Sequence, residues 1–332
     1  MSMLQSIKNV VPKRLKVYIK GLRIFIYDFY IFMENSNLLQ KFDTEYQLKG
    51  KMTLYYHVFE KGLTMPETRL GFGQDNMHVL ISLCELYDEK KYDKDDEVFK
   101  HALNVIQEYV DFHDEKEFIF DKDYYDKMLK VLRLRSKTCE ITKQMTSNPQ
   151  EYFAYSNASY EEFVKSRFSV RNYSNKDIPL EVLHQSINLA QKTPSSCNRQ
   201  PNRVYIIKNP EKIKGVLSLQ NGNRGFGHLA NTLIVLTSDI SIWQGVNDRF
   251  QSHLNSGMFS MSLLYALHFN KIGACPLNWS SDVKSTEAIK KLLSIPKNEL
   301  VTLVISCGYL PEEFKIALSP RLDSKLITTE IL

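Results

Sequence analysis

Three short apolar runs with β-branched residues follow residue 159, and they limit the fold of this chain more than any other feature. The runs span 204–207, 233–237 and 300–307, and each has the length of a buried strand. Helical patterns lie among them, at 180–192 and at 259–268. We therefore expect an α/β sandwich, of the α+β class, in which helices cover both faces of one sheet.

The N-terminal part of the chain shows helical periodicity instead. Apolar residues recur every three to four positions from Val79 to Tyr87 and from Phe99 to Val110, and residues 121–143 give a third helical pattern. The polar run 146–150 contains an Asn-Pro turn signal and is the expected linker. We predict an all-helical domain at 1–150 and a second domain at 151–332.

Composition indicates a globular protein. Apolar residues make up 43% of the 332, and 43 basic against 38 acidic residues leave a net charge of only +5, which argues against a nucleic-acid partner. The five cysteines show no C-x-x-C spacing, so the sequence indicates neither a disulfide framework nor a metal site. This cysteine usage and the lack of a secretory signal pattern favour a cytoplasmic location.

Residues 4–33 predict one or two helices that are basic first and apolar afterwards. The apolar run at 24–33 contains Asp28 and is about half the roughly 20 residues that a membrane span requires. A basic helix beside an aromatic and aliphatic surface could lie on an anionic membrane, which would make the protein membrane-peripheral. Packing against the protein's own core is the favoured alternative.

Two polar clusters flank the helical pattern at 180–192. The first holds Arg167, Ser169 and Arg171 at alternate positions, where two guanidiniums and a hydroxyl point the same way and can bind a phosphate. The second is a proline-opened loop whose small donors and acceptors suit the edge of a planar heterocycle. It comprises Pro194, Ser195, Ser196, Asn198 and Gln200. Together the clusters predict a nucleotide-like ligand.

These two motifs resemble those of the nitroreductase family of FMN-dependent oxidoreductases. They read Arg-Phe-Ser-Val-Arg at 167–171 and Pro-Ser-Ser-Cys-Asn-Arg-Gln-Pro at 194–201. The resemblance implies a central mixed β-sheet flanked by helices, a homodimer, and FMN held by both motifs, Phe168 included. It also implies hydride transfer from NAD(P)H through FMN to a small-molecule acceptor. That chemistry needs no nucleophile and base pair, so no catalytic side chain is named.

Later stretches match the family in the same order. The resemblance places Pro276, Leu277 and Asn278 against the flavin, with a backbone amide near Asn278 addressing the flavin N5. It places Ser319 and Arg321 where the family returns a basic pair to the phosphate, although only Arg321 matches that pair. It also implies that the tail at 325–332 adds a strand to a partner's sheet.

Some positions depart from the family pattern. Asn202 and Arg203 stand where many relatives have an aromatic residue, and Asn278 replaces an acid found in some. The glycines at 222–227 precede a strand, so they do not form a dinucleotide fingerprint. We expect a mobile loop there, from which Asn223 or Arg224 reaches the flavin or a substrate.

The stretch around His57 and Glu60 is the most unusual in the first half. Their spacing puts both on one helix face, and a buried, hydrogen-bonded histidine is favoured over a metal site. The surrounding H-x-x-E-K-G-L sequence resembles N-terminal extensions of nitroreductase-like proteins associated with bacterial polysaccharide gene clusters. That context leaves two alternatives to the oxidoreductase: a non-catalytic scaffold in surface-polysaccharide biosynthesis, or an atypical flavin enzyme.

Overall fold

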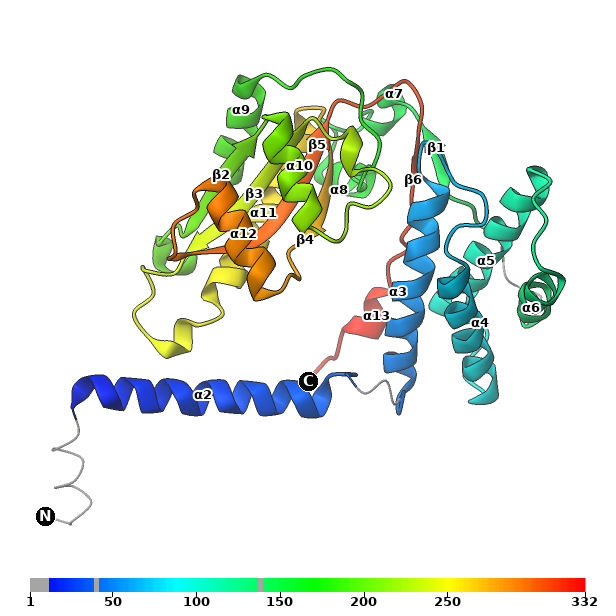
Figure 1. Cartoon of the computed structure of the whole chain (residues 1–332), viewed down its shortest axis with the longest axis horizontal. Coiled ribbons are helices and arrows are strands. Elements are labelled where there is room, and N and C mark those ends of the chain that lie inside the picture. The colour runs from blue at the N-terminus through cyan, green and yellow to red at the C-terminus, as the bar shows by residue number, and fades with distance from the viewer. Residues whose placement is uncertain (1–11, 39–41, 137–139, 332) are drawn as a thin grey trace, which may run out of the picture.

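The computed structural model describes residues 12–38, 42–136 and 140–331. Four helices gather on one side of the molecule, and a four-stranded sheet with its covering helices forms the other side (Figure 1). The expected α+β architecture with a helical N-terminal region is confirmed.

The helical part comprises α3 (Glu45–Leu63), α4 (Gln74–Glu89), α5 (Glu97–Glu115) and α6 (Lys122–Leu132). Polar side chains cap three of these helices: Thr44 forms a capping box with Gln47, and Asp96 and Asp121 accept hydrogen bonds from first-turn amides. The helix predicted to run from 121 to 143 ends at Leu132, because the apolar period stops there and a run of polar and basic residues follows.

The four helices share one core. Its largest fully buried side chains include Phe59, Tyr87, Phe99 and Tyr109, and Tyr87 stacks on Phe99 with ring centroids 4.6 Å apart. Burial of this cluster stabilises the helical part, since fully burying one large apolar side chain contributes roughly 1.5–3 kcal/mol.

The sheet contains β2 (Asn202–Ile207), β3 (Thr232–Asp239), β5 (Glu299–Gly308) and β4 (Gly273–Asn278), in that order across its width. All its neighbouring strands pair antiparallel, so the expectation of a mixed sheet is wrong. β3 and β4 run in the same direction and are joined by α11 (Gln251–Phe269), but β5 inserts between them and pairs with both. A strand–helix–strand pattern in a sequence does not show such an insertion.

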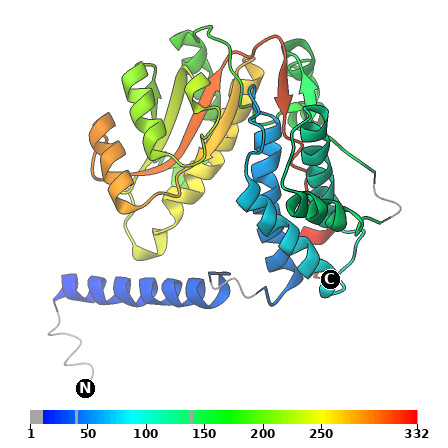
Figure 2. The ribbon, with the colours of Figure 1, turned by 45° about the vertical axis from the view of Figure 1, so that its right-hand side comes forward.

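Helices cover both faces of the sheet, as predicted (Figure 2). Along β3, Leu233 and Val235 face the core beneath α10 (Pro210–Leu219) and α12 (Val283–Leu293). The alternate residues Ile234 and Leu236 face the core beneath α9 (Leu180–Ala190) and α11.

The segment expected to be a linker forms regular structure. β1 (Met145–Ser147) pairs antiparallel with β6 (Phe314–Ile316), and α7 (Pro149–Tyr152) follows directly. The boundary between the parts is therefore tied to the C-terminal segment. After β6 the chain runs beside α3 to the short helix α13 (Ser324–Ile327) (Figure 1). Residues 325–331 form no strand within this single chain, so their addition to a partner's sheet stays a prediction.

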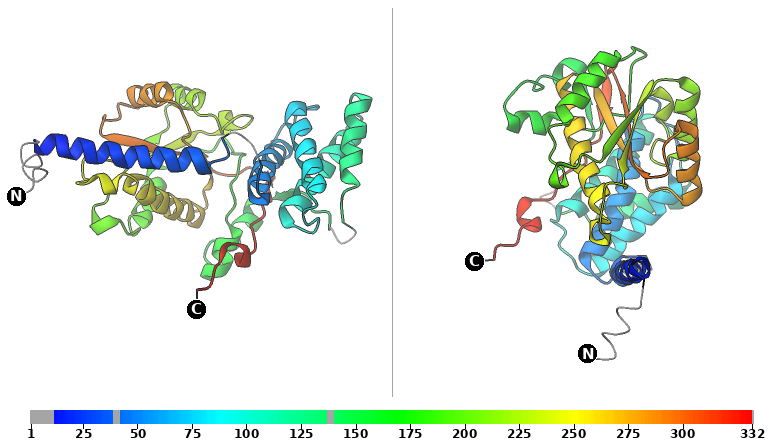
Figure 3. Two further views of the ribbon diagram at one scale, coloured as in Figure 1. Left: turned by 90° about the horizontal axis from the view of Figure 1, so that it is seen from below. Right: turned by 90° about the vertical axis from the view of Figure 1, so that its left-hand side faces the viewer.

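Helix α2 (Lys13–Asn35) lies at the periphery of the molecule, along one side of the sheet part (Figures 1 and 3). It touches the sheet part at η3 (Val246–Asp248), where Gly21 is buried, and Asp28 accepts hydrogen bonds from Arg249 at 2.5 and 2.8 Å. Apart from Ile24, the large apolar side chains of α2 from Leu15 to Met33 have 41–65% of their surface exposed.

The expectation that the N-terminal helix packs against the protein's own core is therefore wrong for α2. Residues 4–11 of that predicted helix lie outside the described residues. Among the helices in the described ranges, none combines the length and apolar character needed to cross a bilayer.

Candidate functional site

The first predicted cluster lies on an extended segment that follows α8 (Tyr160–Ser166). Val170 bridges to Ile316 of β6, and its N–H donates to the carbonyl of Ala274 in β4 at 3.1 Å. The hydroxyl of Tyr152 donates to the carbonyl of Phe168 at 2.7 Å. These contacts hold the segment between the main sheet and the β1–β6 pair.

The alternation predicted for this segment is present. Phe168 and Val170 pack into the core, so Arg167, Ser169 and Arg171 lie on the opposite side of the extended chain. Arg171 is 8% exposed, whereas Arg167 and Ser169 are half-buried.

The charges of three cations act on Cys275 of β4. Arg171 has the largest effect among them, followed by Lys61 and Arg167. Burial raises the pKa of Cys275, while the three cations favour its ionised form. None of these cations forms a salt bridge within the described parts of the chain. Lys61 comes from α3, so the helical part contributes to the charge at this site.

His268 lies beside the same segment, in α11. Its Nε2 is 2.9 Å from the Ser166 hydroxyl, while its buried Nδ1 has no hydrogen-bond partner in the described structure. Burial, and secondarily the charge of Arg167, lower the pKa of His268 to about 4. This histidine is therefore neutral at physiological pH and adds no charge to the cluster.

The second predicted cluster forms a loop that lies on the first half of α11. The N–H of Ser196 donates to Asn255 Oδ1 at 2.9 Å, and the Ser196 hydroxyl donates to Gln251. The Ser195 hydroxyl accepts a hydrogen bond from the N–H of Gln200 at 3.0 Å. Pro194 and Asn198 stay exposed on this loop. The first cluster contacts β4 and β6, so the two clusters are built on different elements.

One buried polar atom beside the second cluster has no partner. Asn202 begins β2, and its Nδ2 donates weakly to the carbonyl of Asn255 at 3.5 Å. Its Oδ1 is buried and accepts no hydrogen bond within the described residues. A buried acceptor without a donor is costly, which makes this atom a candidate for contact with a ligand.

The third predicted group occupies β4, which forms an edge of the sheet. Pro276 is half-buried, Leu277 is buried, and Asn278 is exposed at the strand end. A proline fits here because an edge strand leaves some backbone amides unpaired. The Asn278 carbonyl accepts a hydrogen bond from Gln220 at 2.8 Å, which ties the strand end to the glycine-containing loop.

Ser319 and Arg321 lie against α3 of the helical part. The N–H of Ser319 donates to Glu60 Oε1 at 2.9 Å, and its hydroxyl lies 3.2 Å from Glu60 Oε2. Arg321 is exposed, donates to the Ser319 carbonyl, and lines a cavity of about 670 Å³ against α3 with Tyr56. Neither residue hydrogen-bonds with Arg167 or Arg171 in the described structure. The third cation whose charge acts on Cys275, together with Arg167 and Arg171, is Lys61.

Glu60 joins the helical part to the C-terminal segment. Its buried carboxylate lies 2.7 Å from His57 Nδ1 and 2.8 Å from His101 Nε2, in addition to its contacts with Ser319. Burial opposes its ionisation, but hydrogen bonds from His101 and His57 outweigh burial and lower the pKa of Glu60 to about 2. The predicted pairing of His57 with Glu60 is present, although His57 is half-buried and the buried histidine is His101.

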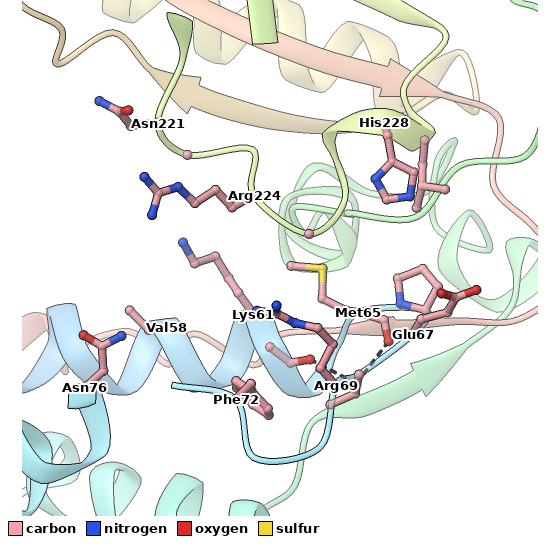
Figure 4. A pocket seen from close by; sticks show the side chains of 16 residues that line it. Val58, Lys61, Met65, Glu67, Arg69, Phe72, Asn76, Asn221, Arg224 and His228 are labelled. Atoms are coloured by element: carbon pink, nitrogen blue, oxygen red, sulfur yellow. Dashed lines mark hydrogen bonds between the residues drawn. The ribbon is translucent and has the colours of Figure 1, made fainter. Parts of the chain in front are cut away.

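A second cavity, of about 530 Å³, lies between α3 and the loop at 221–229 (Figure 4). Lys61 rises from α3 toward Arg224 on the facing loop, and Met65, Arg69 and His228 lie around them. Arg224 therefore lines a cavity, and its expected contact with the flavin or a substrate stays a prediction. Asn223 instead donates to the carbonyl of Leu217 at 2.8 Å and supports the loop from within.

Sequence reasoning missed Lys61 and the connecting role of Glu60. Both sit in the unusual stretch noted in the sequence, but that stretch gives no sign of its partners. Ser319 and Arg171 follow Lys61 by more than a hundred residues, and only the folded chain brings them near α3.

Comparisons with known proteins point to one family. The family model described as the nitroreductase family matches residues 164–220, which contain both predicted clusters. A provisionally named NADH dehydrogenase/NAD(P)H nitroreductase of Archaeoglobus fulgidus is 26% identical over 153 residues, 45% of this chain and 84% of that protein. An iodotyrosine deiodinase of Haliscomenobacter hydrossis is 35% identical over 63 residues, 19% of this chain and 28% of that protein.

Among solved structures, a nitroreductase family protein from Streptococcus pneumoniae TIGR4 has a TM-score of 0.46 and 20% identity, and the match covers 52% of this chain and 100% of that chain. An FMN-dependent nitroreductase from Clostridium difficile R20291 has a TM-score of 0.41 and 23% identity, with 49% of this chain and 92% of that chain covered. Residues 164–220 thus match the nitroreductase family model, and the curated relative from Archaeoglobus fulgidus is similar to 45% of this chain.

Proposed function

We propose that this protein is an FMN-dependent oxidoreductase of nitroreductase type, which transfers hydride from NAD(P)H through FMN to a small-molecule acceptor. The observation that carries the proposal is the group of Arg167 and Arg171 beside Cys275, with no carboxylate partner within the described residues. Clustered cations repel one another, and a bound phosphate would balance them through charge-assisted hydrogen bonds.

The other predicted residues also fit FMN. The loop with Ser195 and Ser196 is already held in shape by α11, and the unpartnered Oδ1 of Asn202 lies beside it. A flavin ring edge has donors and acceptors that suit such groups. When bound, FMN supplies the hydride-transfer chemistry. The chain's own residues bind and orient it: the arginines hold the phosphate, and Pro276 and Leu277 offer an apolar wall.

We also propose that the protein works as a homodimer, because the two clusters are built on different elements of one chain. The exposed face of α11 supports pairing of two copies. Phe250, Leu254 and Met258 follow one another at intervals of four residues there, with 56%, 55% and 37% of their surfaces exposed. A contiguous apolar face of this kind is typical of an interaction surface.

The visible spectrum tests the enzyme assignment. The purified protein should be yellow, or become yellow on reconstitution with FMN, and NADH or NADPH should bleach it. A colourless protein that takes up no FMN would leave the alternative of a scaffold in surface-polysaccharide biosynthesis. A yellow protein that is inert to both nicotinamides would contradict the proposed hydride transfer and favour the atypical flavin enzyme.

A second proposed role is contact of α2 with an anionic membrane surface. Gly21 and Asp28, seven residues apart, face the sheet part. Lys16, Lys20 and Arg23 share a second face, while Leu15, Leu22 and Phe29 share a third. The basic and apolar faces thus both point away from the protein. A helix with this arrangement suits the interface of an anionic bilayer.

A further inference from the structure

Arg199 connects the loop that carries the second predicted cluster with the segment at 240–250, which joins β3 to α11. Its Nε donates to the Ser196 carbonyl at 3.0 Å. Its guanidinium carbon lies 4.3 Å from the centre of the Trp243 ring, and its Nη1 lies 3.5 Å from Asp248 Oδ2. An indole face and a carboxylate both attract a guanidinium, so they hold Arg199 from two sides. We call the segment at 240–250 the bracing segment.

The bracing segment is in turn held by α2. Arg249 makes a bidentate ion pair with Asp28 of α2, with distances of 2.5 Å from Nε to Oδ2 and 2.8 Å from Nη2 to Oδ1. A Cβ built on Gly21 would lie 3.6 Å from a methyl carbon of Val246, so the backbone of the helix lies close to the segment. A continuous series of contacts therefore runs from α2 to the loop with the second cluster.

The attachment of α2 buries little apolar surface. Apart from Ile24, its large apolar side chains from Leu15 to Met33 are 41–65% exposed, so they stabilise the attachment only weakly. The ion pair of Asp28 and Arg249 is itself partly exposed, and such pairs contribute little and are screened by salt. A helix held in this way can detach, and its detachment would release one side of the bracing segment.

We propose that docking of α2 on the bracing segment regulates FMN binding, and that an anionic membrane favours the docked state. This inference rests on the FMN site and the membrane contact proposed above. The docked helix holds the bracing segment, and the segment holds Arg199, whose Nε binds the Ser196 carbonyl. FMN therefore binds more tightly when α2 is docked, because the loop that meets it is already ordered.

The orientation of α2 explains why a membrane favours docking. Gly21 and Asp28 face the sheet part, whereas the basic and apolar faces point away from it. A helix that lies on a bilayer by those two faces keeps Asp28 turned away from the lipid, which is the orientation that the ion pair with Arg249 needs. Coupling between two ligands is reciprocal, so FMN should tighten membrane binding by the same factor as the membrane tightens FMN binding.

Charge reversal in the full chain tests the link. Asp28→Arg and Arg249→Asp should each weaken FMN binding about fivefold or more, because like charges then face each other and α2 detaches. Combining both substitutions restores an ion pair with exchanged partners, so the affinity should return to within about twofold of the wild type. Glu34→Arg makes the same charge change at an exposed position of α2 and should leave FMN affinity unchanged.

Vesicles that contain phosphatidylserine supply the membrane. They should tighten FMN binding by the wild type about fivefold or more. Arg249→Asp keeps the basic and apolar faces of α2, so this variant should still sediment with the vesicles, but its FMN affinity should not respond to them. Neutral vesicles should leave the FMN affinity of both proteins unchanged.

The fluorescence of Trp243 reports the link without FMN. In a Trp279→Phe background, Trp243 is the remaining tryptophan of the chain. Acrylamide should quench it more strongly in Asp28→Arg than in Glu34→Arg, because a released bracing segment no longer keeps Arg199 over its ring.

The outcomes separate this inference from the proposed function. A protein that binds no FMN in any variant would contradict the proposed function, and this inference with it. If the protein binds FMN, equal FMN affinities or equal Trp243 quenching in Asp28→Arg and Glu34→Arg would overturn this inference alone. A wild-type FMN affinity that phosphatidylserine vesicles leave unchanged would also overturn it.

Discussion

At the scale of single residues, the cations without partners carry most of the functional argument. Arg167 is half-buried at the end of α8, and its charge acts on Cys275 and His268. Arg167→Ala should weaken FMN binding by roughly 10- to 100-fold, since a hydrogen bond to a charged group contributes about 1.5–3 kcal/mol. Riboflavin lacks the phosphate, so its affinity should change little. Fluorescence titration with both flavins measures the difference.

The matched control for this prediction is Lys165→Ala. Lys165 lies two residues away on α8, is exposed, and pairs with Glu161. Its loss should alter neither affinity by more than about twofold, because exposed pairs contribute little. Equal losses for FMN and riboflavin in Arg167→Ala would show that the arginine does not bind the phosphate.

Glu60 should make stability depend on pH in the acid range. Its pKa falls from an ordinary value of 4.5 to about 2 in the folded protein. The folded state therefore binds the proton less readily than the unfolded state. The resulting stabilisation is fully present above pH 4.5 and is lost as the pH falls toward 2, with a total on the order of 3 kcal/mol.

Urea unfolding at a series of acid pH values measures this dependence. Glu60→Gln carries no titrating carboxyl, so the free energy of unfolding should fall less steeply for this variant than for the wild type between pH 4.5 and 2. Glu85→Gln, which breaks the exposed ion pair between Glu85 of α4 and Lys130 of α6, should follow the wild type. Parallel curves for the wild type and Glu60→Gln would contradict the role assigned to Glu60.

At the scale of elements, sequence patterns predicted the helices and strands whose formation depends on residues close together in the chain. α5 and α11 follow from apolar periodicity, and β3 follows from an apolar run whose alternate residues fill two cores. The antiparallel insertion of β5 and the pairing of β1 with β6 were not predicted, because they join segments far apart in the sequence. The candidate site divides in the same way: Arg167 and Arg171 belong to one local motif, whereas Lys61 reaches them through folding.

α2 shows the limit of a helical pattern. The periodicity gives a helix but not the surface that covers its apolar residues. If α2 lies on anionic membranes, the protein should sediment with vesicles containing phosphatidylserine and less with neutral vesicles. Reversing Lys16, Lys20 and Arg23 to glutamate should remove that binding, because each basic group near the surface contributes about 1 kcal/mol.

The matched control reverses three exposed cations of the helical part, Lys122, Lys127 and Arg133. This variant should still sediment with anionic vesicles. A different result is expected if a second copy of the chain covers α2. In that case Leu22→Ser with Phe29→Ser would lower the oligomeric mass, and no wild-type protein would sediment with vesicles.

At the scale of the whole molecule, the C-terminal segment couples the two parts. β6 pairs with β1, the N–H of Leu318 donates to Gln144 at 2.8 Å, and Ser319 binds Glu60. Glu108 in turn accepts a hydrogen bond from the N–H of Gln144 at 3.1 Å, which links this segment to α5. The segment that follows β6 therefore hydrogen-bonds to the helical part.

This coupling predicts a single thermal transition, and the tryptophans offer a way to observe it. The chain has two, Trp243 and Trp279, and both lie in the sheet part, whereas circular dichroism also reports the helical part. The two signals should change together in the wild type. Glu60→Ala removes a buried carboxylate that holds Ser319, so the helical signal should be lost at a lower temperature than the tryptophan signal. In Glu85→Ala, the control, the two signals should still change at the same temperature. If they also change together in Glu60→Ala, at the same temperature as in Glu85→Ala, Glu60 does not couple the two parts.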